Sequence, residues 1–151
     1  MPPANTNAVN LRGIAPLLLV YDMPASIRFY RDILGFEIKQ TAETPEIADR
    51  YTWVLLNLNG IELMMEPKFP EKFRPSSYPA QDKDMILYFG CPDVDKAYSN
   101  LQAKGIEIKE PVITGYGFKA LYVRDLMVFY LYFIGRKIND LTPKYLAGYN
   151  R

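Results

Sequence analysis

Apolar residues fill almost every position from 14 to 21, and an aspartate follows directly. A run of this length is too short for a typical helix and predicts a strand that is buried on both faces. Asp22 can cap a helix, Pro24 fits its first turn, and apolar residues then recur at helical spacing as far as Gly35. The pattern therefore predicts a strand followed by a helix that ends at the glycine.

Three further strands are predicted in the first half of the chain. Residues 36–40 and 53–58 have extended patterns, and Asn59-Gly60 is a typical hairpin turn that leads into residues 61–66. The predicted order of elements is therefore βαβββ.

The second half repeats this order. Residues 85–90 predict a strand, Asp93 is a second candidate N-cap, and an apolar helical face runs on to Gly105. The motif Gly-x-Glu-Ile-Lys also occurs once in each half, beginning at Gly35 and at Gly105. The remaining extended patterns cover residues 106–109, 118–124 and 128–133. We expect two copies of one module, which must pack together to close a core.

A polar stretch with four prolines, at residues 67–84, separates the two copies and disfavours regular structure there. The expected organisation is one domain over residues 1–134, followed by a C-terminal extension at 135–151. Within that domain we place module one at 12–66, the loop at 67–84 and module two at 85–134.

Composition excludes several classes of partner. The 18 basic and 17 acidic residues balance without a basic run, which leaves no electrostatic footprint for nucleic acid or for an anionic membrane. No apolar stretch is long enough to span a membrane, and residues 1–10 do not have the pattern of a signal peptide. A single cysteine, Cys91, excludes an internal disulfide. We expect a cytoplasmic protein without nucleic-acid or membrane partners.

The first module resembles the opening of the vicinal oxygen chelate superfamily, which includes glyoxalase I, extradiol dioxygenases, and fosfomycin and bleomycin resistance proteins. The residues that carry this resemblance are Pro-Leu-Leu-Leu-Val-Tyr-Asp at 16–22, Ala25-Ser26, Phe29-Tyr30-Arg31-Asp32 and Leu34-Gly35-Phe36. Pro16 is most similar to the bleomycin resistance branch. The second module adds Asp93-Val94-Asp95, Gly105 and Val123-Arg124-Asp125, so the resemblance extends over residues 12–134. It implies an α+β fold in which two tandem βαβββ modules form curved mixed sheets around a cavity, in a homodimer.

Enzymes of this family hold a divalent metal ion on four side chains, commonly His or Glu. The resemblance places these positions at Ala15, Glu66, Ile86 and Tyr132. Glu66 is the only retained residue of a ligand type, and the chain contains no histidine. We therefore expect no metal and no cofactor, which disfavours the enzyme activities that depend on the metal.

Strand alternation predicts which side chains face the cavity, if the family's ligand positions point inward. The predicted lining is apolar and rich in tyrosine: Ala15, Leu17, Leu19, Trp53, Glu62, Met64, Glu66, Ile86, Tyr88, Tyr116, Phe118, Tyr130 and Tyr132. The opposite alternation is uniformly apolar and should pack beneath the helices. Each aromatic residue of the lining can instead be an ordinary packing residue, Glu66 can be solvent-facing or ion-paired, and Glu62 can be solvated near the end of its strand.

Such a lining suits a flat aromatic or amphipathic molecule. The first hypothesis is a metal-independent protein that binds and sequesters a hydrophobic or aromatic small molecule. The alternative is a lyase or dioxygenase-type enzyme with a site rebuilt around Glu66 and Tyr132, and a third is a scaffold whose pocket has filled with side chains. The net charge of +1 disfavours bleomycin, a cationic drug, as the ligand.

Overall fold

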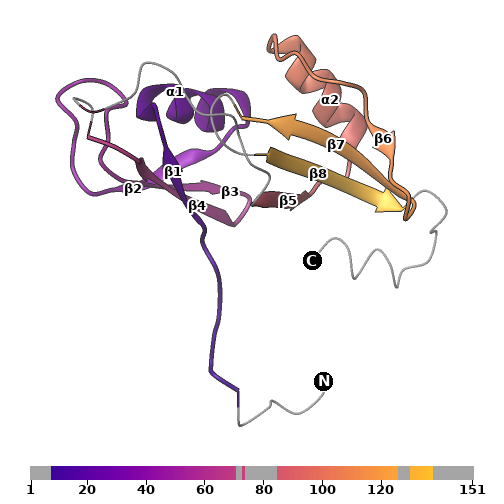
Figure 1. The fold of residues 1–151 in the computed structure, drawn as a ribbon, viewed down its shortest axis with the longest axis horizontal. Helices are drawn as coiled ribbons and strands as arrows, with labels where there is room; N and C mark the ends of the chain where they lie inside the picture. Colours follow the sequence, from indigo (N-terminus) through magenta and orange to yellow (C-terminus); the bar gives the residue numbers. More distant parts are fainter. Residues whose placement is uncertain (1–7, 71–72, 74–84, 126–129, 138–151) are drawn as a thin grey trace.

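A computed structural model describes residues 8–70, 73, 85–125 and 130–137 (Figure 1). Module one contains a short helix and four strands: β1 (Leu17–Val20), α1 (Met23–Ile27), β2 (Glu37–Thr41), β3 (Val54–Leu58) and β4 (Ile61–Pro67). Helix α1 continues as a π-helical segment (Arg28–Ile33). Module two repeats the order with β5 (Ile86–Gly90), α2 (Val94–Ala103), β6 (Val112–Ile113), β7 (Phe118–Arg124) and β8 (Tyr130–Lys137).

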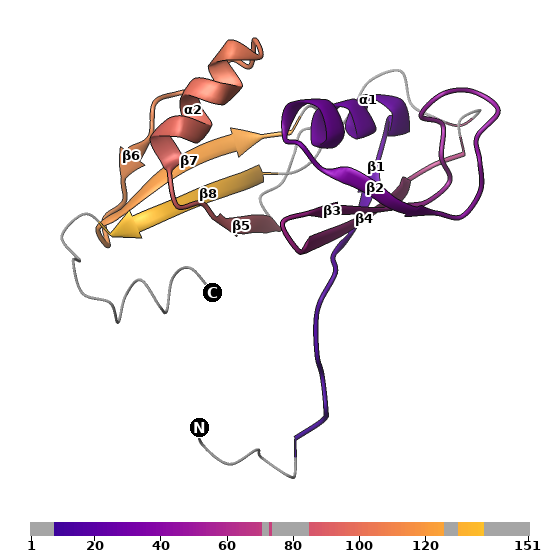
Figure 2. The same cartoon turned by 180° about the vertical axis from the view of Figure 1, so that it is seen from behind.

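Both modules have the same sheet topology. The strand orders are β1-β4-β3-β2 and β5-β8-β7-β6, and in each sheet the first and last strands of the module pair in parallel. The two sheets lie side by side, and α1 and α2 cover them from the same side (Figures 1 and 2). The predicted α+β fold of two tandem βαβββ modules is confirmed.

Matching signals begin and end the two helices. The carboxylate of Asp22 accepts a hydrogen bond from the third backbone N–H after it at 3.1 Å, and Asp93 does the same at 3.0 Å. Gly35 and Gly105 follow the helices with φ of 93° and 79°, a region that glycine enters without strain. The repeated Gly-x-Glu-Ile-Lys motif therefore begins at the residue that ends each helix.

The core lies between the sheets and their helices, as the alternation predicts. Five of the eight residues that alternate toward the helices are fully buried, namely Leu18, Val20, Leu63, Met65 and Leu131. The other three, Leu87, Phe89 and Phe133, are partly buried against the same core. A polar contact joins the modules within it, since the hydroxyl of Tyr30 donates a 2.8 Å hydrogen bond to the buried carboxylate of Asp125.

Three details differ from the predicted elements. Strand β1 is not covered on both faces, because Leu17 and Leu19 lie on the face opposite to α1 and are 40% and 41% exposed. The second strand of module two is not at 106–109 but at Val112–Ile113, where the backbone pairs with β7, while Ile106 and Ile108 pack against the core. Strand β8 continues to Lys137, past the boundary expected at 134.

Parts of the predicted 67–84 loop, of the strand at 128–133 and of the extension at 135–151 lie outside the described residues. Within the part of the chain that is described, no helix has the length and apolar character needed to cross a membrane.

Candidate functional site

Each sheet has an open face, which we define as the face opposite to its helix. The segment at residues 8–16 runs from β1 away from the body on this side (Figures 1 and 2). Ala15 is half-buried at the base of this segment, and Leu17 and Leu19 follow on β1. The first three predicted lining residues therefore lie at or beside the open face of module one.

Strand pairing extends this face across module one. Met64 on β4 pairs with Leu17 on one side and with Leu55 of β3 on the other, which makes an aliphatic row across three strands. Glu66 pairs with Leu19 at the next open-face position. Trp53 is half-buried and precedes β3 in the alternation of Leu55.

Glu62 also lies on β4, but its carboxylate is occupied. It forms a 2.6 Å ion pair with the ammonium of Lys39 on β2, which lies beyond β3 in the same sheet. The alternatives for Glu62 were ligand contact and solvation near the end of the strand, and the structure instead shows an ion pair with Lys39.

Three tyrosines form a row across the open face of module two. Tyr132 on β8 pairs directly with Tyr88 on β5 and with Tyr122 on β7. The ring centroid of Tyr132 lies 5.3 Å from that of Tyr88 and 4.5 Å from that of Tyr122, with the rings tilted edge to face. Tyr88 is 61% exposed and Tyr122 is 48% exposed. We call these three residues the tyrosine row.

Further aromatic and charged groups lie beside this row. Tyr116 contacts Phe118 with ring centroids 5.6 Å apart, and Ile86 pairs with Tyr130 one position before the row. The guanidinium of Arg124 lies 5.7 Å from the ring centroid of Tyr130. Four of the six lining residues predicted in module two, Ile86, Tyr88, Tyr130 and Tyr132, lie on the paired strands β5 and β8. The other two are Tyr116, in the turn before β7, and Phe118, the first residue of β7.

The surroundings of Tyr88, at one end of the tyrosine row, favour the protonated form of its phenol. Partial removal from water, followed by the proximity of Tyr116 and Tyr132, raises the pKa of Tyr88 above its ordinary value of 10.0. At neutral pH the hydroxyl of Tyr88 is therefore a neutral hydrogen-bond donor and acceptor.

Sequence reasoning left Tyr122 out of the lining, although it belongs to the tyrosine row. Its position follows from pairing with Tyr132 in the β7–β8 ladder, and a register shift in β7 between Phe118 and Ala120 disturbs the alternation before it. The signal that could have found Tyr122 was its own alternation with Val123, which is buried while Tyr122 is exposed.

A hollow of about 840 Å³ lies where the two modules meet. One wall comes from the turn between β3 and β4, and the other comes from β5. Three of the predicted residues line it, namely Glu62, Ile86 and Tyr88. Tyr88 therefore belongs both to this hollow and to the tyrosine row.

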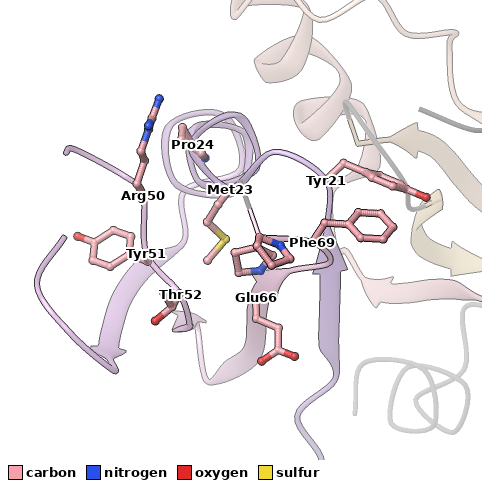
Figure 3. Close-up of a pocket in the computed structure, with 10 residues that line it drawn as sticks. Tyr21, Met23, Pro24, Arg50, Tyr51, Thr52, Glu66 and Phe69 are labelled. Carbon is pink, nitrogen blue, oxygen red and sulfur yellow. The ribbon is translucent and has the colours of Figure 1, made fainter. Parts of the chain in front are cut away.

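A second cavity, of about 450 Å³, lies at the end of the module-one sheet (Figure 3). We call it the edge pocket. Glu66 lines it together with residues at the junction of β1 and α1, the segment 50–52 before β3, and the residues that follow β4. Glu66 and Tyr132, around which the alternative enzyme site was predicted, therefore lie in different sheets, one in the edge pocket and one in the tyrosine row.

The residues at the family's metal positions do not fit a metal ion. Ala15 and Ile86 have hydrocarbon side chains, and Tyr132 carries a phenol that packs in the tyrosine row. The strand ladders pair Leu19 with Glu66 and pair Gly90 with Ile134, so the position in module two that corresponds to Glu66 by register is also a hydrocarbon. Among the described residues, no three His, Cys, Asp or Glu side chains gather in a way that could hold a metal.

Comparison with known families matches residues 13–126 to the Glyoxalase/Bleomycin resistance protein/Dioxygenase superfamily. The chain belongs to this superfamily. A search of curated protein sequences found no match.

Solved structures of superfamily members share the fold. A glyoxalase/bleomycin resistance protein/dioxygenase from Nocardioides has a TM-score of 0.60 and 18% identity, covering 90% of this chain and 93% of its own. The bleomycin-binding protein of Streptomyces verticillus, complexed with copper(II)-bleomycin, has a TM-score of 0.60 and 17% identity, with coverages of 85% and 98%. Lactoylglutathione lyase from Agrobacterium tumefaciens has a TM-score of 0.59 and 17% identity, with coverages of 88% and 100%. A binding protein and an enzyme are thus equally similar to this chain, so the branch within the superfamily is not resolved.

Proposed function

We propose that this superfamily member binds a planar aromatic small molecule, without a metal ion or other cofactor, on the tyrosine row. The observation that carries the proposal is the alignment of Tyr88, Tyr132 and Tyr122 in one cross-strand row on an open face. Aromatic pairs contribute about 0.5–1.5 kcal/mol each beyond the area they bury, and tyrosine loses little conformational entropy on binding. Three rings in fixed register therefore suit a flat ligand.

The hollow between the modules supports the same proposal. Its volume of about 840 Å³ falls within the range of small-molecule sites, and Tyr88 connects it to the tyrosine row. A ligand stacked on the row extends from Tyr88 into this hollow, where Ile86 supplies apolar contact. The neutral phenol of Tyr88 can orient a polar group of the ligand by a hydrogen bond.

The test is a thermal-shift screen of planar aromatic compounds, followed by calorimetric titration of those that stabilise the protein. We expect one ligand per open face of module two, unchanged binding after chelator treatment, and recovery of the compound chemically unaltered. Formation of a product would favour the lyase or dioxygenase alternative.

Substitutions locate the ligand. Tyr122→Ala and Tyr132→Ala each remove one ring of the row and should weaken binding about tenfold. Tyr98→Ala is the matched control, because Tyr98 lies on α2 and its hydroxyl accepts a hydrogen bond from Gln102 at 2.7 Å. Equal affinity for the wild type and both row variants would contradict the proposal.

The proposal includes a homodimer in the cytoplasm. Apolar side chains on β1 and in the preceding segment are exposed in one copy of the chain and could be covered by a second copy. Leu17, Leu19 and Ile14 are each at least 40% exposed. Analytical ultracentrifugation should give twice the mass of 17.4 kDa. Leu19→Ser should shift the equilibrium toward the monomer, and a concentration-independent monomer for the wild type would refute this part.

A further inference from the structure

The edge pocket forms where three chain segments meet at one end of the module-one strands. Strands β1 and β4 are parallel and terminate at this end, while β3 is antiparallel to β4 and begins there, with Val54 opposite Met65. The chain then turns into α1 after β1 and continues to Phe69 and Pro70 after β4. Crevices outside the carboxyl ends of parallel strands are frequent ligand sites in open sheets.

The walls of the edge pocket are mostly apolar. Met23 and Tyr21 come from the junction of β1 and α1, Pro67 is the last residue of β4, and Phe69 and Pro70 come from the segment after it. In Figure 3 the thioether of Met23 points into the space between Thr52 and Glu66, and the side-chain oxygens of Thr52 and Glu66 lie toward the same side. A ligand in this space meets an apolar wall and two oxygen groups.

Glu66 differs from the other partly buried carboxylates of module one. Glu62 is paired with Lys39 at 2.6 Å, and Asp49 is paired with Arg31 at 2.7 Å. Glu66 is half-buried, and neither an ion pair nor a hydrogen bond joins its carboxylate to any part of the chain that the structure describes. Partial burial of a carboxylate without a partner costs free energy, which a cationic donor would offset.

Two basic residues lie near Glu66, namely Lys68 in the sequence and Arg50 in the pocket wall. The side chains of both are directed away from the carboxylate of Glu66. The ammonium of Lys68 lies 3.4 Å from the hydroxyl of Tyr21 and 5.2 Å from its ring centroid. The guanidinium of Arg50 points away from the labelled residues of the pocket in Figure 3. Among the described residues, no cationic group is paired with Glu66, and its position in a mostly apolar cavity leaves room for a cationic ligand.

We propose that the edge pocket is a second binding site, which takes an organic ammonium ion attached to an aromatic or aliphatic group. The ammonium donates charge-assisted hydrogen bonds to the carboxylate of Glu66, and Thr52 accepts a further one. The apolar part of the ligand packs against Met23, Phe69 and Tyr21. The volume of about 450 Å³ is enough for a small amine of this kind. The inference does not depend on binding at the tyrosine row.

Three probes that share a phenylethyl group separate charge from hydrophobic contact: 2-phenylethylamine, 2-phenylethanol and 3-phenylpropionate. The protein carries six methionines, and ¹³C labelling of their methyl groups gives a local reporter, with Met23→Leu to assign the pocket signal. The amine should shift the Met23 resonance and leave that of the core residue Met65 in place. It should bind about fivefold tighter than the alcohol, and the carboxylate should bind weakest.

Glu66→Gln keeps the size of the side chain and removes its charge, so the preference for the amine over the alcohol should vanish. Glu62→Gln is the matched control on the same strand and should leave the preference unchanged. Tyr132→Ala should also leave it unchanged, which separates this site from the tyrosine row. The comparison of amine and alcohol in the wild type remains decisive even if a variant fails to fold. Equal affinity for the two probes, no Met23 shift, or an amine preference that survives Glu66→Gln would overturn the proposal.

Discussion

The hydrogen bond between Tyr30 and Asp125 should be one of the most stabilising polar contacts between the modules. It joins the helical segment of module one to the end of β7, across 95 positions of sequence. The donor is fully buried and the acceptor residue is 5% exposed. Tyr30→Phe removes the hydroxyl, keeps the ring in the core, and leaves Asp125 buried with one hydrogen bond fewer.

The magnitude follows from the charge of the acceptor. A hydrogen bond to a charged group contributes about 1.5–3 kcal/mol, and a buried acceptor that loses its donor costs a similar amount. Asp125 has a further interaction in the native structure, so we expect about 2 kcal/mol rather than the upper limit. For a chain of 151 residues this corresponds to a decrease in Tm of about 4–8 °C.

The same contact has a pH dependence of defined sign. Burial, followed by the charge of Asp125 and the hydrogen bond to it, raises the pKa of Tyr30 well above the ordinary value of 10.0. Below pH 10 the phenol is protonated in both states. Above it the unfolded state loses the proton first, so the unfolded state binds fewer protons and stability falls as pH rises. The advantage of the wild type over Tyr30→Phe should therefore be constant between pH 7 and 9 and shrink above pH 10.

Urea unfolding of both proteins at pH 7, 9 and 10.5 measures this difference. Tyr98→Phe is the control, because the hydroxyl of Tyr98 is bonded to Gln102 on the exposed surface of α2 and should cost less than about 0.5 kcal/mol. The reasoning fails if Tyr30→Phe is as stable as the control variant. It also fails if the difference between wild type and Tyr30→Phe grows as the pH is raised above 10.

Three further predictions concern single contacts. Gly135→Ala should destabilise the protein by about 1–3 kcal/mol, because the added Cβ would lie 2.7 Å from the Cγ2 of Val94; Val94→Ala in the same chain should restore part of the loss in urea unfolding. Asp22→Ala and Asp93→Ala should each lower the free energy of unfolding by about 1 kcal/mol through loss of an N-cap, and stability equal to the wild type would contradict the capping role. The Cys91 thiol should react with iodoacetamide at pH 8 more slowly than in urea-unfolded protein, because burial raises its pKa, and equal rates would refute this.

The fold was predictable where local signals and the global arrangement agree. Asp22 and Gly35 delimit the first helix in sequence and in structure, and Asp93 and Gly105 do so for the second. Pairing partners across a sheet are long-range properties, so the sequence placed the second strand of module two too early. Only the β7 ladder determines that this strand forms at Val112–Ile113.

The face of the sheet on which each candidate residue lies was predictable, but the way these residues are arranged in space was not. Alternation assigned Leu17, Tyr88 and Glu66 to the face opposite the helices, where the structure places them. It could not show that Glu66 lines a cavity with Met23 and the residues after β4, because that cavity depends on where three loops converge. Nor could alternation show that Lys39 would form an ion pair with Glu62, since the two residues lie 23 positions apart in the sequence.

The duplicated module gives the two open faces the same geometry with different chemistry. Module one carries the row Leu17, Met64 and Leu55, and module two carries Tyr88, Tyr132 and Tyr122 at the corresponding ladder positions. The following position pairs Leu19 with Glu66 in one copy and Gly90 with Ile134 in the other. The aromatic stacking surface therefore lies on module two, and the carboxylate of Glu66 lies on module one. A symmetric metal site needs matching donors from both halves, whereas two separate sites for an aromatic ring and for a cation need the asymmetry that this chain has.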